Sequence, residues 1–226
     1  MGGFPLMKDR TYPVVCVTGP MAAGKNLAAA IFEKMGWVSI DADIVAHQVL
    51  DIVKDQVVAL HQEKAQALGL NLLSEDGRLN RKAIAQIVFS DKEALEKHEA
   101  LLFPMIDTLL RDFIEKNKEK PVVINATVLY KVPLIHEMDA VFFIDAPRCL
   151  RLLRAMKRDK RSAKEILQRF SSQKNIFAKY KISNADTCRV WNISFPWILE
   201  YKIRRILKLW IRKKHYGLLP LQALFY

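Results

Sequence analysis

Short apolar runs alternate with longer segments of helical periodicity along this chain. Several runs, such as residues 121–124 and 140–144, are apolar without a break. Continuous apolar strands are typical of parallel sheets that helices cover on both faces. The pattern therefore predicts an α/β fold with a doubly wound, parallel, five-stranded sheet. Its strands are expected at residues 13–18, 37–40, 121–125, 140–145 and 188–192.

The segments between these runs carry apolar residues at the spacing of a helix. Pro104 is expected to open a new helix, because proline fits the first turn of a helix but lacks the N–H that the interior needs. The predicted helices span residues 27–34, about 44–68, 81–88, 92–102, 104 to about 120, and 197–211.

The last of these helices has apolar residues at 203, 206, 207, 210 and 211, which form one helical stripe. We expect it to close the domain with four bulky side chains buried, because such side chains are unfavourable in water; they are Trp197, Ile203, Leu207 and Trp210. A basic helix with tryptophan also suits an anionic membrane or a nucleic acid, and this alternative stays open.

Composition is compatible with one compact domain over residues 1–226, of which 51% are hydrophobic. The three cysteines, Cys16, Cys149 and Cys188, are far apart, so we expect free thiols and a cytoplasmic location rather than a disulfide framework or a metal site. The N-terminus has no apolar signal core, and no apolar run is long enough for a bilayer. We expect no membrane partner.

Positive charge is concentrated in two segments of the chain. Residues 148–164 hold eight Lys or Arg and one Asp, a net charge of +7, and residues 197–226 hold seven and one Glu, a net charge of +6. The whole chain carries +12, so the remainder is close to neutral at −1. A broadly positive surface is therefore not predicted, and we expect no nucleic-acid partner.

A glycine-bounded loop ending in lysine follows the first predicted strand and precedes the first helix. This layout is typical of a phosphate-binding P-loop, in which backbone N–H groups and the helix N-terminus face phosphate oxygens. Asn26 stands where Ser or Thr normally offers a hydroxyl to Mg²⁺. The alternative is an ordinary strand–turn–helix. The candidate ATP-binding residues are Gly19, Pro20, Met21, Ala22, Ala23, Gly24, Lys25, Asn26 and Leu27.

Polar residues follow the other predicted strands, where parallel sheets place their ligand sites. They are Asp41 and Asp43, Asn125 and Thr127, and Asp145. Two carboxylates beside a P-loop have a chemical use: one binds a magnesium-bound water and one accepts a proton from an attacking hydroxyl. A single residue serving both roles is an alternative, and another is that either aspartate caps the next helix.

Taken in order, further segments of the chain resemble the dephospho-coenzyme A kinase family. The resemblance runs from the P-loop to about residue 192. No segment beyond the P-loop is specific alone, whereas their order and spacing together are. The segments are 40–47 (IDADIVAH), 77–82 (GRLNRK), 88–91 (VFSD), 99–106 (EALLFPMI), 153–159 (LRAMKRD), Arg169, Gln173 and 184–186 (NAD).

The resemblance implies a kinase of the nucleoside-monophosphate-kinase type, which carries out the last step of coenzyme A biosynthesis. Such an enzyme transfers the γ-phosphoryl group of ATP to the ribose 3′-hydroxyl of dephospho-CoA, giving CoA and ADP. By the resemblance, Lys25 neutralises the transferring group, Asp43 is the catalytic base and contacts the acceptor, and Asp41 holds Mg²⁺ through water. Asn26 would be the second metal-site residue.

The resemblance also assigns arginines and regions. Arg81 would bind the phosphates of the acceptor, while Arg154 and Arg158 would close over ATP from a lid. The protein would be a monomer or a weak homo-oligomer. The implied regions are a core at about 12–42, 121–146 and 187–193, a helical acceptor-binding region at about 44–120, a lid at about 148–180, and a basic helix and tail at about 196–226.

Four positions depart from the family pattern. Besides Asn26, Phe103 stands where the family usually has His, Thr127 replaces a proline, and Lys131 reverses the sign of a Glu. These departures concern acceptor recognition more than ATP binding. Two alternatives to the implied activity therefore remain: a P-loop kinase for a nucleotide or another alcohol, and a catalytically degenerate nucleotide-binding protein.

Overall fold

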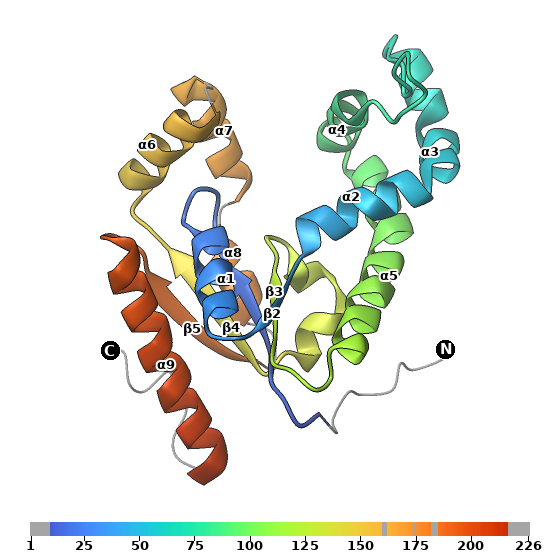
Figure 1. Cartoon of the computed structure of the whole chain (residues 1–226). Helices are drawn as coiled ribbons and strands as arrows, with labels where there is room; N and C mark the ends of the chain where they lie inside the picture. Colours follow the sequence, from blue (N-terminus) through green and yellow to red (C-terminus); the bar gives the residue numbers. More distant parts are fainter. Residues whose placement is uncertain (1–9, 160–161, 174, 182–184, 217–226) are drawn as a thin grey trace. The chain divides into compact units, whose positions relative to one another are not determined.

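The computed structural model describes residues 10–159, 162–173, 175–181 and 185–216 (Figure 1). By its internal contacts the chain divides into two compact units. The first unit comprises Met1–Asp41 and Phe113–Tyr226, and the second comprises Ala42–Asp112. The parallel sheet lies in the first unit, and the second unit is helical.

A five-stranded, fully parallel sheet forms the centre of the first unit, in the order β2-β3-β1-β4-β5. The predicted fold class is therefore confirmed. The strands fall within about two residues of the predicted positions. They are β1 Val14–Thr18, β2 Val38–Asp41, β3 Val122–Asn125, β4 Ala140–Asp145 and β5 Asp186–Trp191.

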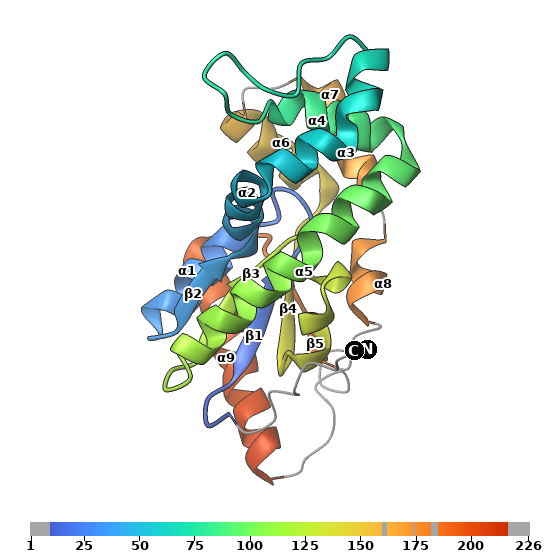
Figure 2. The ribbon, with the colours of Figure 1, turned by 90° about the vertical axis from the view of Figure 1, so that its right-hand side faces the viewer.

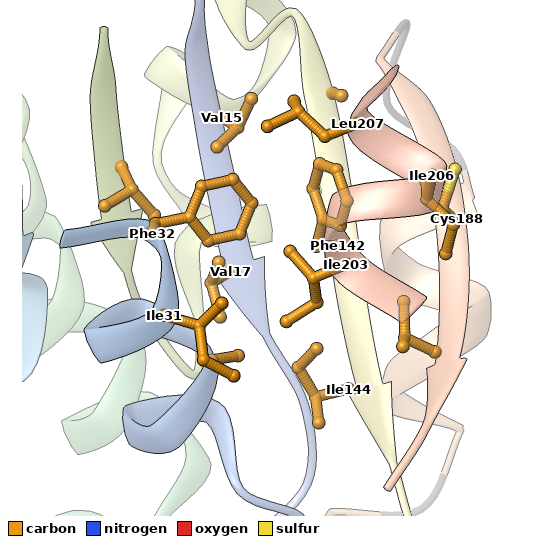
Figure 3. Packing of buried hydrophobic residues seen from close by; sticks show 14 of the residues in the cluster. Val15, Val17, Ile31, Phe32, Phe142, Ile144, Cys188, Ile203, Ile206 and Leu207 are labelled. Carbon is orange, nitrogen blue, oxygen red and sulfur yellow. The ribbon is translucent and has the colours of Figure 1, made fainter. Parts of the chain in front are cut away.

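Helices α1 (Lys25–Lys34) and α9 (Pro196–Tyr216) pack against one face of the sheet. Figure 3 shows Phe32 of α1 and Ile203 of α9 beside Val15, Val17 and Phe142 of the strands. The ring centroids of Phe32 and Phe142 are 5.1 Å apart in an edge-on contact. This packing fixes the start of α1, and with it the P-loop, against the sheet.

Phe143 follows Phe142 in β4 and lies on the opposite face of the sheet, because side chains alternate along a strand. Phe143 contacts Phe177 of α8 (Ile176–Lys181) at 4.8 Å between ring centroids, so α8 lies across the sheet from α1 and α9 (Figure 2). Two short 3₁₀ helices, η1 (Leu129–Lys131) and η2 (Pro133–Glu137), follow β3 and bury Leu129, Leu134 and Ile135.

The structure confirms α9 as a closing helix, with one exception in its predicted face. Ile203, Leu207 and Trp210 are buried, as is Leu199. Trp197 is 67% exposed, so its predicted burial is wrong. The helix also extends five residues past the predicted end at residue 211, to Tyr216. The tail at 217–226 lies outside the described residues.

Two further helices of the first unit carry most of the basic segment, namely α6 (Arg148–Asp159) and α7 (Ala163–Ser172). A capping box starts α7: the Ser162 hydroxyl accepts from the N–H of Glu165, and the Glu165 carboxylate accepts from the N–H of Ser162. Ala155, Ile166 and Phe170 form a small apolar cluster, against which Met21 and Ala22 of the P-loop pack. The tip of the loop therefore rests on α6 and α7.

The second unit contains α2 (Ala42–Ile52), α3 (Lys54–Ala67), α4 (Arg81–Ser90) and most of α5 (Lys92–Lys116). The helical region expected at 44–68 is therefore two helices that break at Val53. Buried histidines of this unit face each other, with His61 Nε2 3.0 Å from His98 Nδ1.

Pro104 lies inside α5, so the prediction that it opens a new helix is wrong. Proline removes one helical N–H, and this costs roughly 3 kcal/mol in a helix interior. A buried stripe at every fourth position, Leu102, Ile106, Leu110 and Ile114, continues through the site and offsets that loss. Among the described helices, none is long and apolar enough to cross a membrane.

Candidate functional site

The loop between β1 and α1 has the backbone conformation that a P-loop requires. Gly19 and Gly24 have φ of 154° and 107°, where side chains are strained. A Cβ on Gly19 would lie 2.1 Å from the Ile144 carbonyl oxygen, and one on Gly24 would lie 2.3 Å from Asn192 Nδ2. Only glycine fits at either position. Gly24 precedes α1, so Lys25 is the first helical residue and Asn26 and Leu27 follow in the first turn.

Side chains from distant parts of the chain hold this loop in place. At Met21, the backbone N–H donates to Gln173 Oε1 at 2.7 Å, and the carbonyl accepts from Arg151 Nε at 2.9 Å. The carbonyl of Ala23 accepts from Asn192 Nδ2 at 2.8 Å. The loop is thus held in one conformation by Arg151 of α6, by Gln173 directly after α7, and by Asn192 directly after β5.

The ends of β2 and β3 meet the start of α1 in a polar cluster. Asp41 and Asn125 are paired in the register of β2 and β3. The Asn125 Nδ2 group donates to Asp41 Oδ2 at 2.8 Å and to Asn26 Oδ1 at 3.2 Å. The structure thus brings together both residues that the sequence predicts for a metal site, with Asn125 between them.

Hard oxygen donors at this cluster fit Mg²⁺, which accepts carboxylate and carbonyl oxygens and keeps several waters. In the part of the chain that the structure describes, no group of three or more His, Cys, Asp or Glu side chains lies close enough to hold a metal ion. A site of one carboxylate and one carboxamide therefore suits an ion whose remaining ligands are waters and phosphates.

Asp145, at the end of β4, has a structural role. Its Oδ1 accepts from the N–H of Ala146 at 2.8 Å, and its Oδ2 accepts from Arg189 Nε at 2.9 Å. The Arg189 guanidinium also stacks over the Trp191 ring at 4.5 Å. The carboxylate is thus bound to a cation on the neighbouring strand, β5.

Arg154 of α6 reaches the same end of the sheet. Its Nη2 donates to the carbonyl of Asn192 at 3.2 Å, and partial burial lowers the pKa of its guanidinium. Its Nη1 atom is buried without a hydrogen-bond partner among the described residues. A buried cationic donor of this kind is unfavourable unless an anion joins it. Arg158, one turn later, is exposed and paired with Asp159.

Two predicted site residues belong to the second unit. Asp43 is exposed in the first turn of α2, where a carboxylate is favourable towards the helix dipole. Arg81 begins α4 and faces Asp51, with Nη2 3.3 Å from Oδ2. Their placement fits both the chemical interpretation and the alternative of ordinary helix-end charges.

The positions that depart from the family pattern have different surroundings. The carbonyl of Thr127 accepts from the Tyr180 hydroxyl at 3.2 Å. Lys131 ends η1, and Phe103 is half-buried in α5. Arg151 and Asn192, which hold the P-loop, were not predicted as site residues. A signal existed for Asn192, which directly follows a strand.

Comparison with known proteins agrees with this geometry. A sequence model of the dephospho-CoA kinase family matches residues 13–188. A dephospho-CoA kinase from Treponema denticola is 39% identical over 200 residues, covering 86% of this chain and 89% of that protein. One from Treponema pallidum is 34% identical over 198 residues, covering 86% and 94%.

Two solved structures extend the comparison. TT1252 from Thermus thermophilus superposes with a TM-score of 0.72 at 26% identity, covering 88% of this chain and 98% of that one. Dephospho-CoA kinase from Campylobacter jejuni has a TM-score of 0.61 at 25% identity, covering 86% and 95%. With the family match over residues 13–188, these similarities establish that the chain belongs to the dephospho-CoA kinase family.

Proposed function

We propose that this chain transfers the γ-phosphoryl group of ATP to the ribose 3′-hydroxyl of dephospho-CoA, giving CoA and ADP in the cytoplasm. The observation that carries the proposal is the preorganised P-loop, whose two glycines and clamped backbone hold one conformation directly before α1. Phosphoryl transfer depends on positioning and charge neutralisation, and a rigid loop at a helix N-terminus supplies both.

ATP binds along residues 19–27, with its phosphates against the loop backbone. The conformations of Gly19 and Gly24 support this assignment. Lys25, at the N-terminus of α1, adds its charge to that of the helix dipole and meets the β- and γ-phosphates. Its role is to neutralise the charge of the γ-phosphoryl group during transfer, and it forms no covalent bond.

The metal site is assigned to Asp41 and Asn26. Asp41 acts through a water, and Asn26 offers its carboxamide oxygen in place of the usual hydroxyl. When bound, Mg²⁺ would neutralise negative charge that develops on the phosphates during the transfer. The support is the shared contact of both side chains with Asn125.

Asp43 is assigned as the base. It accepts the proton of the 3′-hydroxyl while that oxygen attacks the γ-phosphorus and ADP leaves. Only Ala42 separates it from Asp41, so the Cα atoms of the two aspartates are at most about 7 Å apart. Arg81 binds the acceptor's phosphates, for which the planar guanidinium is suited.

Arg154 and Arg158 are assigned to the closing lid at about 148–180. The buried Nη1 of Arg154, which has no hydrogen-bond partner in the described part of the chain, supports a phosphate contact, because a phosphate oxygen would satisfy it. Arg158 would exchange its bond with Asp159 for ATP. The helices at about 44–120 bind the acceptor, and the protein acts as a monomer or a weak homo-oligomer.

The proposal is tested by ADP release with dephospho-CoA beside a panel of nucleotide and sugar alcohols. Mass spectrometry would identify the phosphorylated product. Activity confined to dephospho-CoA supports the proposal, and activity with another alcohol overturns it. A silent panel with intact ATP binding would mean a degenerate nucleotide-binding protein.

Asp43→Asn tests the base, with Asp55→Asn as a matched control. Both aspartates are exposed at the second position of a helix, so each variant removes the same favourable charge from a helix start. Asp43→Asn is expected to lower kcat by about 10²–10⁴-fold, with ATP affinity unchanged and a melting temperature equal to that of Asp55→Asn. Equal activity of the two variants would favour the helix-end interpretation.

A further inference from the structure

Asn125 lies at the centre of the polar cluster but has no assigned role in the reaction. It is the last residue of β3, the strand between β1 and β2, and it is only 4% exposed. In the parallel register it pairs with Asp41 on one side and Val17 on the other. Its side chain therefore sits where the two strands and the start of α1 converge.

Hydrogen-bond chemistry fixes the orientation of all three side chains. An ionised carboxylate only accepts, so Asn125 must turn its NH₂ group towards Asp41. The second hydrogen of that group points to Asn26, which must then present its oxygen. Rotating either amide by 180° would place like atoms against each other. One buried NH₂ group thus determines where both candidate metal-site oxygens lie.

The remaining atom of Asn125 indicates a ligand. Its Oδ1 is buried and has no hydrogen-bond partner among the described residues. Buried carboxamide oxygens are normally satisfied, and an asparagine that only ties two strands together would gain by pairing this atom. A water in the hydration shell of Mg²⁺ is a strong donor and would satisfy this atom.

We propose that Asn125 is a positioning residue of the metal site, which orients Asp41 and Asn26 and accepts from a water of the hydrated ion. The inference deepens the proposed function and rests on it. Replacing Asn125 should weaken the binding of Mg²⁺ while leaving the contacts between the P-loop and the phosphates intact. A residue that only holds the strands would instead affect every form of nucleotide binding together with stability.

Asn125→Leu keeps the side-chain size and removes both polar ends. We expect it to raise the Mg²⁺ concentration for half-maximal ADP release about tenfold, which corresponds to about 1.4 kcal/mol. Calorimetry should find Mg·ADP bound about tenfold more weakly and metal-free ADP bound as before. Asn117→Leu is the control, because it removes one bond from Nδ2 to the Phe113 carbonyl outside the site and should leave all three values unchanged.

Asn125→Asp provides a test with Mg²⁺ alone. It places a second carboxylate against Asp41, and a divalent cation relieves the repulsion between them. The melting temperature of this variant should rise with added MgCl₂ more steeply than that of the unaltered protein. The proposal is overturned if Mg²⁺ has the same effect on both, or if Asn125→Leu weakens metal-free and metal-bound ADP equally. Because binding and melting need no acceptor, these results hold even if dephospho-CoA proves not to be the substrate.

Discussion

The two tryptophans of α9 offer a matched test of how this helix is held. Trp210 is 1% exposed and Trp197 is 67% exposed, although both lie in one helix. Trp210 packs in the core shared with α1 and the sheet, and its Nε1–H donates to Asp186 Oδ2 at 3.2 Å. Replacing each by alanine makes the same chemical change at opposite levels of burial.

The expected effects differ severalfold. Trp210→Ala removes a large buried ring and should destabilise the fold by about 3–5 kcal/mol. For a chain of this length, each 1 kcal/mol lowers the melting temperature by roughly 2–4 °C, so a fall of roughly 6–20 °C is expected. Trp197→Ala should change stability by less than about 0.5 kcal/mol, because its side chain is already in water.

Urea unfolding followed by far-UV circular dichroism measures both variants. Equal denaturant slopes would show that a shift in midpoint reports stability rather than a change in the unfolded state. Trp210→Phe keeps an aromatic ring and removes the N–H, so a smaller loss of about 1–2 kcal/mol is expected. Equal effects of Trp197→Ala and Trp210→Ala would refute the packing argument, and stable, active forms of both would make α9 an accessory arm.

Two further predictions concern charge. Lys25→Ala should lower kcat by about 10³-fold or more, because it removes the cation at the β- and γ-phosphates; near-normal ADP release would contradict the P-loop assignment. Acid should destabilise the protein below about pH 6.5, the usual pKa of an unfolded histidine. Burial lowers the pKa of His61, and burial and His61 lower that of His98 to about 4. The unfolded chain then binds protons that the folded chain does not. The urea concentration at the midpoint of unfolding should therefore fall as the pH is lowered from 6.5 towards 4, and this fall should be less steep in His98→Leu.

Most of the fold follows from the period of the apolar residues, and the errors at Pro104 and Trp197 have physical causes. Pro104 is a reliable breaker only where nothing else holds the helix, whereas the stripe from Leu102 to Ile114 continues through it. Trp197 was assigned to the core for its hydrophobicity. It precedes Ile203 by six residues, about 240° around a helix, while Leu199 lies one turn before Ile203 on the buried face. The helical spacing of the apolar residues therefore predicts burial in α9 better than the hydrophobicity of a single residue does.

Some contacts of the candidate site could also be predicted from the sequence, and others could not. The convergence of parallel strands at one edge predicts that Asp41 and Asn125 lie together, and they do. The clamps on the P-loop were not predictable from local pattern. Arg151, Gln173 and Asn192 each bond to a loop backbone atom more than one hundred residues away, and such bonds have no sequence period.

The departure at Asn26 has a geometric consequence that a hydroxyl at this position would not have. Asparagine carries its oxygen one bond further from the backbone than serine or threonine does, and here that oxygen reaches Asn125 Nδ2 at 3.2 Å. The two asparagines therefore form one unit: the longer side chain at the P-loop needs a donor to hold it, and Asn125 supplies that donor while also holding Asp41. A change at either position alone should be felt at the other. Asn26→Thr, for example, would leave one hydrogen of Asn125 without its acceptor, even though it restores the usual P-loop residue.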